Sequence, residues 1–178
     1  KWKEDKHIYN PDNYLLDQHI QQFCSKERLL ELVNNFVVFD AGIKKLCRPN
    51  QYFGVKEAQQ FVKRKEGGII WHTQGSGKSY SMVFFCQKIH HKFTGSYTFL
   101  IVTDRNELDT QIYGTFSGAG AVPQIKAGHK DSLKANSGKH LRELLSSEHR
   151  YLFTLIHKFN FEEEITKRDN IIVISDEA

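Results

Sequence analysis

From residue 68 onward, short runs of continuously apolar residues alternate with segments in which apolar residues recur at helical spacing. The apolar runs predict buried strands at 68–73, 96–104, 150–156 and 170–176, with a further short strand at 121–127. The periodic segments predict helices at 77–93, 106–116 and 133–147. Strands that are apolar throughout and separated by helices are typical of a parallel sheet covered on both faces. The pattern therefore predicts an α/β fold, a parallel sheet flanked by helices.

The first part of the chain has a different pattern, which predicts a helical lead-in to this fold. Ser25 is placed to cap a helix with an apolar stripe. The stripe consists of Leu29, Leu32, Val33 and Phe36. The next residues, "VVFDAG" at 37–42, predict an extended segment that then turns. Pro49 is suited to begin another helix, because the fixed backbone angle of proline fits the first helical position.

Composition narrows the class of protein. The chain has 178 residues, of which 39% are hydrophobic and 26% charged, as in a globular domain rather than a disordered chain. Its formal net charge of +4 is compatible with a nucleic-acid partner but is found in many other domains. The sequence has neither an apolar run long enough to cross a membrane nor the apolar core of a signal peptide. We therefore expect a cytoplasmic protein with no membrane partner.

The chain ends and the cysteines add two expectations. The sequence begins without methionine and stops within "IIVISDEA", so we expect a fragment of a larger protein. Cys24, Cys47 and Cys86 are odd in number and lack metal-ligand spacing, which favours reduced, mostly buried thiols. The histidines show no ligand spacing either, so no metal cluster of histidine and cysteine is expected.

The segment "GIIWHTQGSGKSYSMVFF" at 68–85 predicts a phosphate-binding loop between a strand and a helix. Gly75 and Gly77 can adopt backbone angles that turn successive N–H groups toward an anion. The start of the following helix adds further N–H groups and the positive end of the helix dipole. Lys78 would supply a cation for the β- and γ-phosphates of ATP, and the Ser79 hydroxyl a ligand for Mg²⁺. The predicted loop contacts are Gln74, Gly75, Ser76, Gly77, Lys78 and Ser79.

His72 occupies the place where the usual phosphate-loop pattern has its first glycine. The residues that would face phosphate begin at Gly75, so this departure leaves the predicted site intact. For His72 we expect a structural role at the end of the strand. The competing interpretation of the whole segment is a glycine-rich turn that binds nothing. The Lys-Ser pair and the helix that follow the turn argue against it.

An ATPase also needs a carboxylate that orders the metal ion and another that activates water. Asp176 and Glu177 follow the apolar run at 171–174, which is where such carboxylates are found. Asp176 would hold Mg²⁺ through water, and Glu177 would polarise the attacking water. Lys78 and Glu177 are therefore the predicted catalytic residues. A chance Asp-Glu pair after a strand is the alternative, made less attractive by the phosphate loop 98 residues earlier (176 − 78).

Several motifs together resemble the restriction (R) subunit of type I restriction–modification enzymes. "GGIIWHTQGSGKS" at 67–79, histidine included, is similar to the first motor motif of that family. Three later segments resemble further motor motifs of the family: "IVTDRNELDTQIYGTF" at 101–116, "TLIHKF" at 154–159 and "SDEA" at 175–178. "RPNQYFGVKEA" at 48–58 resembles the segment in which a glutamine recognises adenine, here Gln51. "ERLLELVNNFVVFD" at 27–40 resembles the linker between nuclease and motor.

The resemblance implies a helical linker at 1–48 and a first RecA-like motor domain at 49–178, partial because it stops after the Asp-Glu-Ala motif. Such superfamily-two motors translocate double-stranded DNA with ATP and Mg²⁺. They work with modification and specificity subunits and deliver DNA to a nuclease domain that is absent from this chain. The resemblance also implies DNA-backbone contacts for Arg105 and Lys158, which carry no sequence information. A solvated charge at a strand end is the competing interpretation for both residues.

Two other interpretations remain open. Another superfamily-two motor, such as an RNA helicase or a chromatin-type translocase, would share the phosphate loop. Stimulation of ATP hydrolysis by single-stranded RNA and not by duplex DNA would identify it. Alternatively, the chain is an inactive structural piece, because it lacks the second motor domain that would supply an arginine finger and close the ATP site. We expect the isolated chain to hydrolyse ATP very slowly at best.

Overall fold

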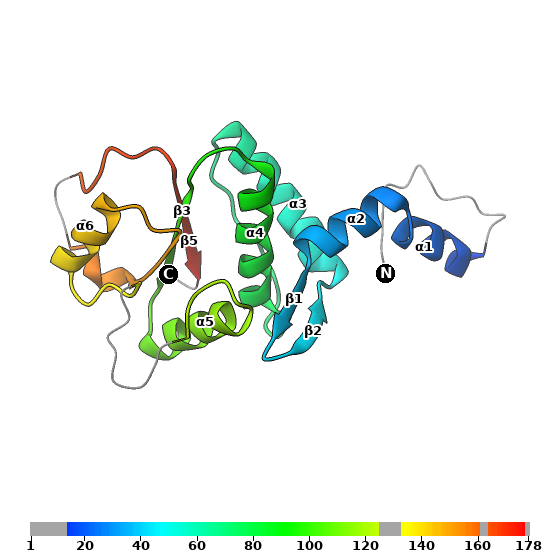
Figure 1. Cartoon of the computed structure of the whole chain (residues 1–178), viewed down its shortest axis with the longest axis horizontal. Helices are drawn as coiled ribbons and strands as arrows, with labels where there is room; N and C mark the ends of the chain where they lie inside the picture. The colour runs from blue at the N-terminus through cyan, green and yellow to red at the C-terminus, as the bar shows by residue number, and fades with distance from the viewer. Residues whose placement is uncertain (1–13, 125–132, 161–163, 177–178) are drawn as a thin grey trace. The chain divides into compact units, whose positions relative to one another are not determined.

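The fold is described from a computed structural model that covers residues 14–124, 133–160 and 164–176. Contacts divide the chain into two compact units. The first, called here the loop unit, comprises residues 1–38 and 43–88. The second, called the sheet unit, comprises residues 39–42 and 89–178. Figure 1 shows the order of helices and strands along the chain, in colours that run from blue at the N-terminus to red at the C-terminus.

The loop unit is mainly helical. Its helices are α1 (Leu15–Phe23), α2 (Lys26–Asn35), α3 (Pro49–Arg64) and the part of α4 (Lys78–Lys92) up to Lys88. Pro49 is the first residue of α3, as predicted, and Lys65 ends that helix in the left-handed conformation, with φ of 57°. Ser25 is the N-cap residue of α2, although its side chain makes no capping hydrogen bond.

Between α2 and α3 the chain forms a hairpin of β1 (Val37–Asp40) and β2 (Ile43–Leu46). Ala41 and Gly42 make the turn with φ of 50° and 82°, the positive angles that tight two-residue hairpin turns require. The predicted extended segment and turn are confirmed, whereas β2 was not predicted. Lys44 and Lys45 interrupt its apolar pattern, so that a strand of only four residues leaves no alternation to read.

Aromatic packing holds the helices of the loop unit together. The ring of Phe36 lies 4.9 Å from that of Tyr52 and 5.8 Å from that of Phe84, and all three side chains are buried. Leu32 and Phe36 of the predicted stripe are therefore core residues. The other two stripe residues, Leu29 and Val33, are 39% and 68% exposed, so the prediction was wrong for them.

The strand predicted at 68–73 does not form. Residues 66–73 have no regular secondary structure, and Ile69 and Trp71 are 93% and 89% exposed. An apolar segment becomes a strand only where a neighbouring backbone accepts and donates its ladder hydrogen bonds. Nothing in the described part of the chain supplies such a ladder here, so the apolar run alone was an insufficient signal.

The sheet unit contains three parallel strands in the order β4-β3-β5. They are β3 (Thr98–Thr103), β4 (Tyr151–Leu155) and β5 (Ile171–Asp176), each within a range predicted from the sequence. The register pairs Thr103 with Leu155 on one side and with Asp176 on the other. The carboxyl ends of all three strands therefore meet at one edge of the sheet.

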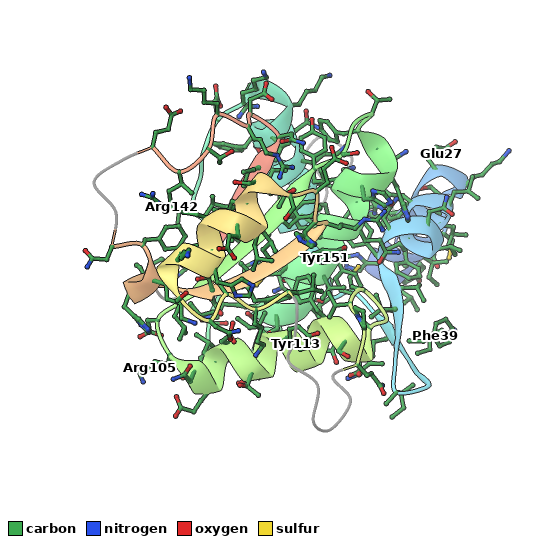
Figure 2. All side chains as sticks on the ribbon, turned by 60° about the vertical axis from the view of Figure 1, so that its left-hand side comes forward. Glu27, Phe39, Arg105, Tyr113, Arg142 and Tyr151 are labelled. Atoms are coloured by element: carbon green, nitrogen blue, oxygen red, sulfur yellow. The ribbon has the colours of Figure 1, made fainter. Side chains whose placement is uncertain are left out.

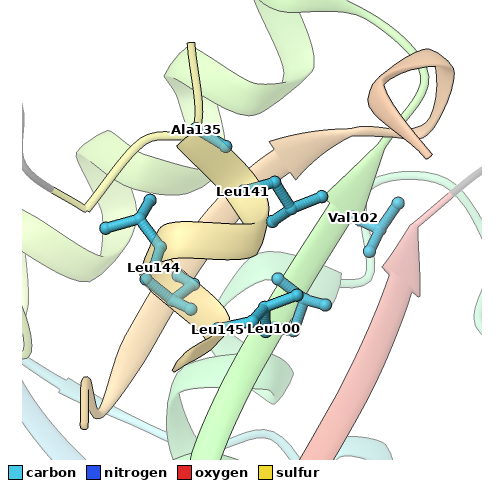
Figure 3. Packing of buried hydrophobic residues seen from close by; sticks show 7 residues of the cluster. Leu100, Val102, Ala135, Leu141, Leu144 and Leu145 are labelled. Atoms are coloured by element: carbon cyan, nitrogen blue, oxygen red, sulfur yellow. The ribbon is translucent and has the colours of Figure 1, made fainter. Parts of the chain in front are cut away.

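Helices cover both faces of this sheet. Leu141, Leu144 and Leu145 of α6 (Gly138–Ser146) pack on Leu100 and Val102 of β3, as Figure 3 shows. On the opposite face the aromatic rings of Tyr113 and Phe116, from α5 (Asn106–Gly118), contact those of Tyr151 and Phe153 on β4. The predicted α/β class with a parallel sheet flanked by helices is confirmed. β5 is an edge strand of this sheet, with Val173 60% exposed, so its burial is less complete than predicted.

Residues 121–124 form no strand, and the rest of the strand predicted at 121–127 lies outside the described residues. Among the helices of the described residues, none is long and apolar enough to cross a membrane.

Candidate functional site

The predicted phosphate loop lies in the loop unit and leads directly into α4. Gln74 and Gly75 form a turn, and Lys78 and Ser79 are the first two residues of the helix. Gly75 and Gly77 have φ of 73° and 87°, angles that residues with a side chain rarely adopt. Left-handed glycines at a helix start can turn backbone N–H groups toward an anion, although the N–H of Ser76, between the two glycines, here donates to the carbonyl oxygen of Thr73 at 3.2 Å. The geometry is therefore suited to the phosphates of a nucleotide.

A buried hydroxyl adds to the fit between the loop and a phosphate. Within the described residues, the Oγ atom of Ser76 is buried without a hydrogen-bond partner. A buried hydroxyl of this kind costs free energy unless a partner binds it, and a phosphate oxygen would be one. Lys78 and Ser79, both half-buried, follow two and three residues later at the start of α4, and their contacts with phosphate and metal stay predictions.

Gln51 supports the loop from α3. Its side chain is 4% exposed, and its Nε2 donates to the carbonyl oxygen of Gly77 at 2.8 Å. Its Oε1 accepts from the backbone N–H of Arg48 at 2.7 Å. The predicted adenine contact of Gln51 is not in conflict with these bonds, because an amide group has two N–H hydrogens and two oxygen lone pairs. The contact with adenine stays a prediction.

Two basic residues beside the loop were not predicted. The Nη1 of Arg48 donates to the carbonyl oxygen of Gly75 at 3.2 Å. The ammonium of Lys45, from β2, hydrogen-bonds the hydroxyl of Tyr80 and lies 4.6 Å from the centre of its ring. Arg48 could have been suspected from the sequence, since it stands three residues before Gln51 at the start of the same helix. Lys45 could not, because only the hairpin brings it to α4.

His72 contacts α3 and not the phosphate-facing part of the loop. A Cβ atom placed on Gly54 would lie 3.3 Å from its Nε2, a tight contact, so the ring is packed closely against the helix at this glycine. The expected structural role of His72 agrees with this position, although the strand whose end it was to occupy is missing.

The second group of predicted residues lies at the carboxyl edge of the sheet in the sheet unit. Asp176 is the last residue of β5 and is 7% exposed. Its register partner Thr103 is fully buried, with an Oγ1 atom that has no hydrogen-bond partner among the described residues. Paired residues of parallel strands point to the same face, so both side chains lie on the face of the sheet that α5 covers at β3 and β4. Glu177, the predicted water-activating residue, lies outside the described residues.

The two predicted DNA contacts follow neighbouring strands at the same edge. Arg105 is the N-cap residue of α5 and has a side chain that is 76% exposed, with Nε 3.1 Å from Oδ2 of Asp104. Figure 2 shows it at the start of that helix. Lys158 ends the short 3₁₀ helix Ile156–Lys158, and its ammonium donates to the carbonyl oxygen of Ala135. Arg105 is thus accessible to a partner, while Lys158 is engaged within the sheet unit.

The three cysteines are free thiols, Cys24 exposed and Cys47 and Cys86 buried. Burial, to which the charge of Glu31 adds, raises the pKa of the Cys47 thiol to about 12. Burial likewise raises the pKa of the Cys86 thiol well above its ordinary value. Neither buried thiol is suited to nucleophilic or metal-binding chemistry at neutral pH.

Comparison with known proteins identifies the class to which this loop and fold belong. Residues 50–178 match the family model of the SWI2/SNF2 ATPase. The chain therefore belongs to the SWI2/SNF2 ATPase family, and its α/β fold is RecA-like.

Individual relatives indicate a narrower class of protein than the family model does. The chain is 38% identical over 174 residues to the type I restriction enzyme HindI endonuclease subunit of Haemophilus influenzae, a match that covers 85% of this chain and 16% of the relative. It is 31% identical over 181 residues to the putative type I restriction enzyme MjaIXP endonuclease subunit of Methanocaldococcus jannaschii, covering 92% and 16%. To the MjaVIIIP endonuclease subunit of the same organism it is 27% identical over 211 residues, covering 100% and 19%. The predicted resemblance to the R subunit is confirmed, and the chain spans about a sixth of the length of the first two relatives.

Proposed function

We propose that this chain binds ATP with Mg²⁺ and forms part of a motor that translocates double-stranded DNA in a type I restriction enzyme. The observation that carries the proposal is the loop itself, in which two left-handed glycines precede Lys78 and Ser79 at the start of α4. Membership of an ATPase family and similarity to endonuclease subunits support it. The DNA would be moved before a nuclease domain elsewhere in the enzyme cleaves it.

Each predicted residue has a role in this proposal. The backbone of Gly75, Ser76 and Gly77 would enclose the phosphates, and Lys78 would neutralise the β- and γ-phosphate charge. The Ser79 hydroxyl would be a ligand for Mg²⁺, and Asp176, in the sheet unit, would hold Mg²⁺ through water. Bound Mg²⁺ supplies positive charge against the phosphate oxygens. Glu177 would accept a proton from the attacking water.

The proposal extends to the partners. Arg105, exposed at the carboxyl edge of the sheet, would bind the DNA backbone, and Lys158 would do so on release of its internal bond. Contacts to phosphate position a duplex without reading its sequence, so recognition would belong to the modification and specificity subunits. We place the protein in the cytoplasm, without a membrane partner.

Nucleotide binding by the isolated chain tests the first step. We expect a fluorescent ATP analogue to bind in the presence of Mg²⁺ and Lys78→Ala to weaken binding at least tenfold, the loss of a charge-assisted contact of about 1.5–3 kcal/mol. Lys92→Ala is the matched control, because Lys92 is an exposed lysine at the other end of α4. Equal affinity of the Lys78→Ala and wild-type chains would refute the proposed site.

Translocation by the intact endonuclease subunit, assembled with its partner subunits, tests the second step. We expect Lys78→Ala to abolish ATP-driven movement on duplex DNA, and duplex DNA to stimulate hydrolysis. Stimulation by single-stranded RNA alone would instead identify another superfamily-two motor. For the isolated chain we expect very slow hydrolysis at best, and vigorous turnover that is lost in Glu177→Gln would contradict that expectation.

A further inference from the structure

Glu31 of α2 joins three helices of the loop unit. Its Oε1 accepts a hydrogen bond from Nζ of Lys88 on α4 at 2.5 Å, and its Oε2 accepts one from the hydroxyl of Tyr52 on α3 at 2.5 Å. Lys56, one turn beyond Tyr52, places its ammonium 3.9 Å from the same Oε2. One carboxylate therefore bonds to side chains of both α3 and α4.

The lysine that pairs with Glu31 is buried to a degree that is unusual for a charged group, whereas the side chain of Glu31 itself is 20% exposed. Lys88 is 1% exposed, Tyr52 is also 1% exposed, and the ammonium of Lys88 lies 5.0 Å from the centre of the Phe36 ring. Burial of Glu31 would raise its pKa, but hydrogen bonds from Lys88 and Tyr52, with the charges of Lys88 and Lys56, outweigh it and lower the pKa. The carboxylate is thus held in its charged form.

A buried ion pair is weak evidence for stability, because apolar residues of the same volume often stabilise a core as well or better. Its two bonds nevertheless demand a particular geometry, which apolar packing does not. The cluster is better explained by what it positions than by the free energy of unfolding that it contributes.

Both helices that Glu31 holds carry parts of the nucleotide site. Tyr52 directly follows Gln51, which donates to the carbonyl oxygen of Gly77. Lys88 and Lys78 lie on the same rigid helix ten residues apart, roughly 15 Å at the rise of an α-helix. A shift of α3 against α4 would therefore move Gln51 away from Gly77 and open the loop.

We propose that Glu31 is a positioning residue for the nucleotide site, which sets α3 against α4 so that Gln51 holds the phosphate loop in its binding shape. This inference rests on the proposed ATP-binding function. It makes α2, a helix some forty residues ahead of the loop, part of the device that sets nucleotide affinity.

Two variants and a control test the proposal. Glu31→Gln removes the charge with little change of volume, and Tyr52→Phe removes one hydrogen bond with the ring kept. We expect each to weaken binding of a fluorescent ATP analogue roughly threefold to tenfold, the range of coupling through a packed network. Glu27→Gln, an exposed carboxylate on the same helix (Figure 2), should bind as the wild type does. Circular dichroism and thermal unfolding select a temperature at which all the chains are folded.

A double-mutant cycle separates positioning from general stability. Gln51→Ala should weaken nucleotide binding in the wild-type chain and should do so much less in the Glu31→Gln chain, because the support is already lost. Additive losses, or wild-type affinity in both folded variants, would overturn the inference. If the wild-type chain binds nucleotide through Lys78 but is insensitive to Glu31, only this inference fails. If the wild-type chain binds no nucleotide, the proposed function fails with it.

Discussion

Replacing Gly77 with alanine should damage the loop more than the same change at Gly75, although both glycines are left-handed. The two φ angles are similar, 87° and 73°, so the backbone strain of an alanine is similar at both positions. Their surroundings differ. A Cβ atom at Gly77 would lie 2.6 Å from Nε2 of Gln51, whereas one at Gly75 would meet nothing within 4 Å.

The magnitudes follow from these contacts. Gly75→Ala should lower the free energy of unfolding by the strain of a left-handed alanine, about 1–2 kcal/mol. Gly77→Ala adds displacement of the Gln51 amide and loss of its hydrogen bond to the Gly77 carbonyl oxygen, about 1 kcal/mol more. Gln51→Ala added to Gly77→Ala should then cost little beyond Gly77→Ala alone, since the bond that it removes is already broken.

Urea unfolding followed by circular dichroism measures these differences, and nucleotide titration should give the same order of affinities. Gly114→Ala is a useful control: Gly114 lies inside α5 with nothing within 4 Å of a Cβ atom. There alanine should stabilise by about 0.5–1 kcal/mol, because it favours the helix. Equal losses at Gly75 and Gly77, or full additivity of Gly77→Ala with Gln51→Ala, would show that the approach of Gln51 does not govern the loop.

Three further outcomes are expected. Because the pKa of Glu31 is lowered in the folded chain, its carboxylate stabilises the fold fully above the ordinary pKa of 4.5. This contribution is lost as pH falls through the lower pKa of the folded state. Melting temperatures measured from pH 7 to pH 3 should therefore fall less steeply for Glu31→Gln than for the wild type. Among the described residues, the ionisable groups that interact with Glu31 are Tyr52, Lys56 and Lys88, together with the thiol of Cys47, whose pKa the charge of Glu31 helps to raise. Lys88→Met should lower the free energy of unfolding, measured with urea, by about 3 kcal/mol, because it leaves a mostly buried carboxylate without its main partner. Adding Glu31→Leu to the same chain should restore most of that stability. If it does not, loss of the ion pair is not the cause. A thiol reagent at pH 8 should modify the exposed Cys24 rapidly in the native chain. It should react with Cys47 and Cys86 only after unfolding, because both thiols are buried and have raised pKa values. Fast reaction of all three cysteines in the native chain would contradict that burial.

The sheet unit was the easier part to predict from sequence. β3 and β4 are buried on both faces, so their apolar runs reflect their own environment, and each strand was found within about two residues of its ends. α5 and α6 followed from helical spacing, although α6 is shorter than predicted, since Ser137 caps it and the residues before it form a turn and a bridge.

The loop unit was harder, for a physical reason. The run at 68–73 has the composition of a strand, but its secondary structure depends on a partner that no residue of the run specifies. The loop residues themselves were predictable, because glycine, lysine and serine act there through their own backbone angles and side chains. The support beneath the loop was not, since Lys45, Glu31 and Lys88 reach their partners only through the tertiary arrangement of the loop unit.

The strand order of the sheet has a consequence for how the chain folds. β3 is the central strand, yet its partners lie far along the chain: Phe99 pairs with Tyr151, 52 residues later (151 − 99), and Thr98 with Ile171, 73 residues later (171 − 98). Parallel pairing at such separations is slow, because loop-closure entropy must be overcome before any ladder bond forms. During synthesis β3 therefore leaves the ribosome with both edges unpaired and must wait for β5, a few seconds or more at ordinary elongation rates of roughly 5–20 residues per second. Over that interval its six residues, all buried in the folded state, form an exposed and aggregation-prone segment of the kind that chaperones bind.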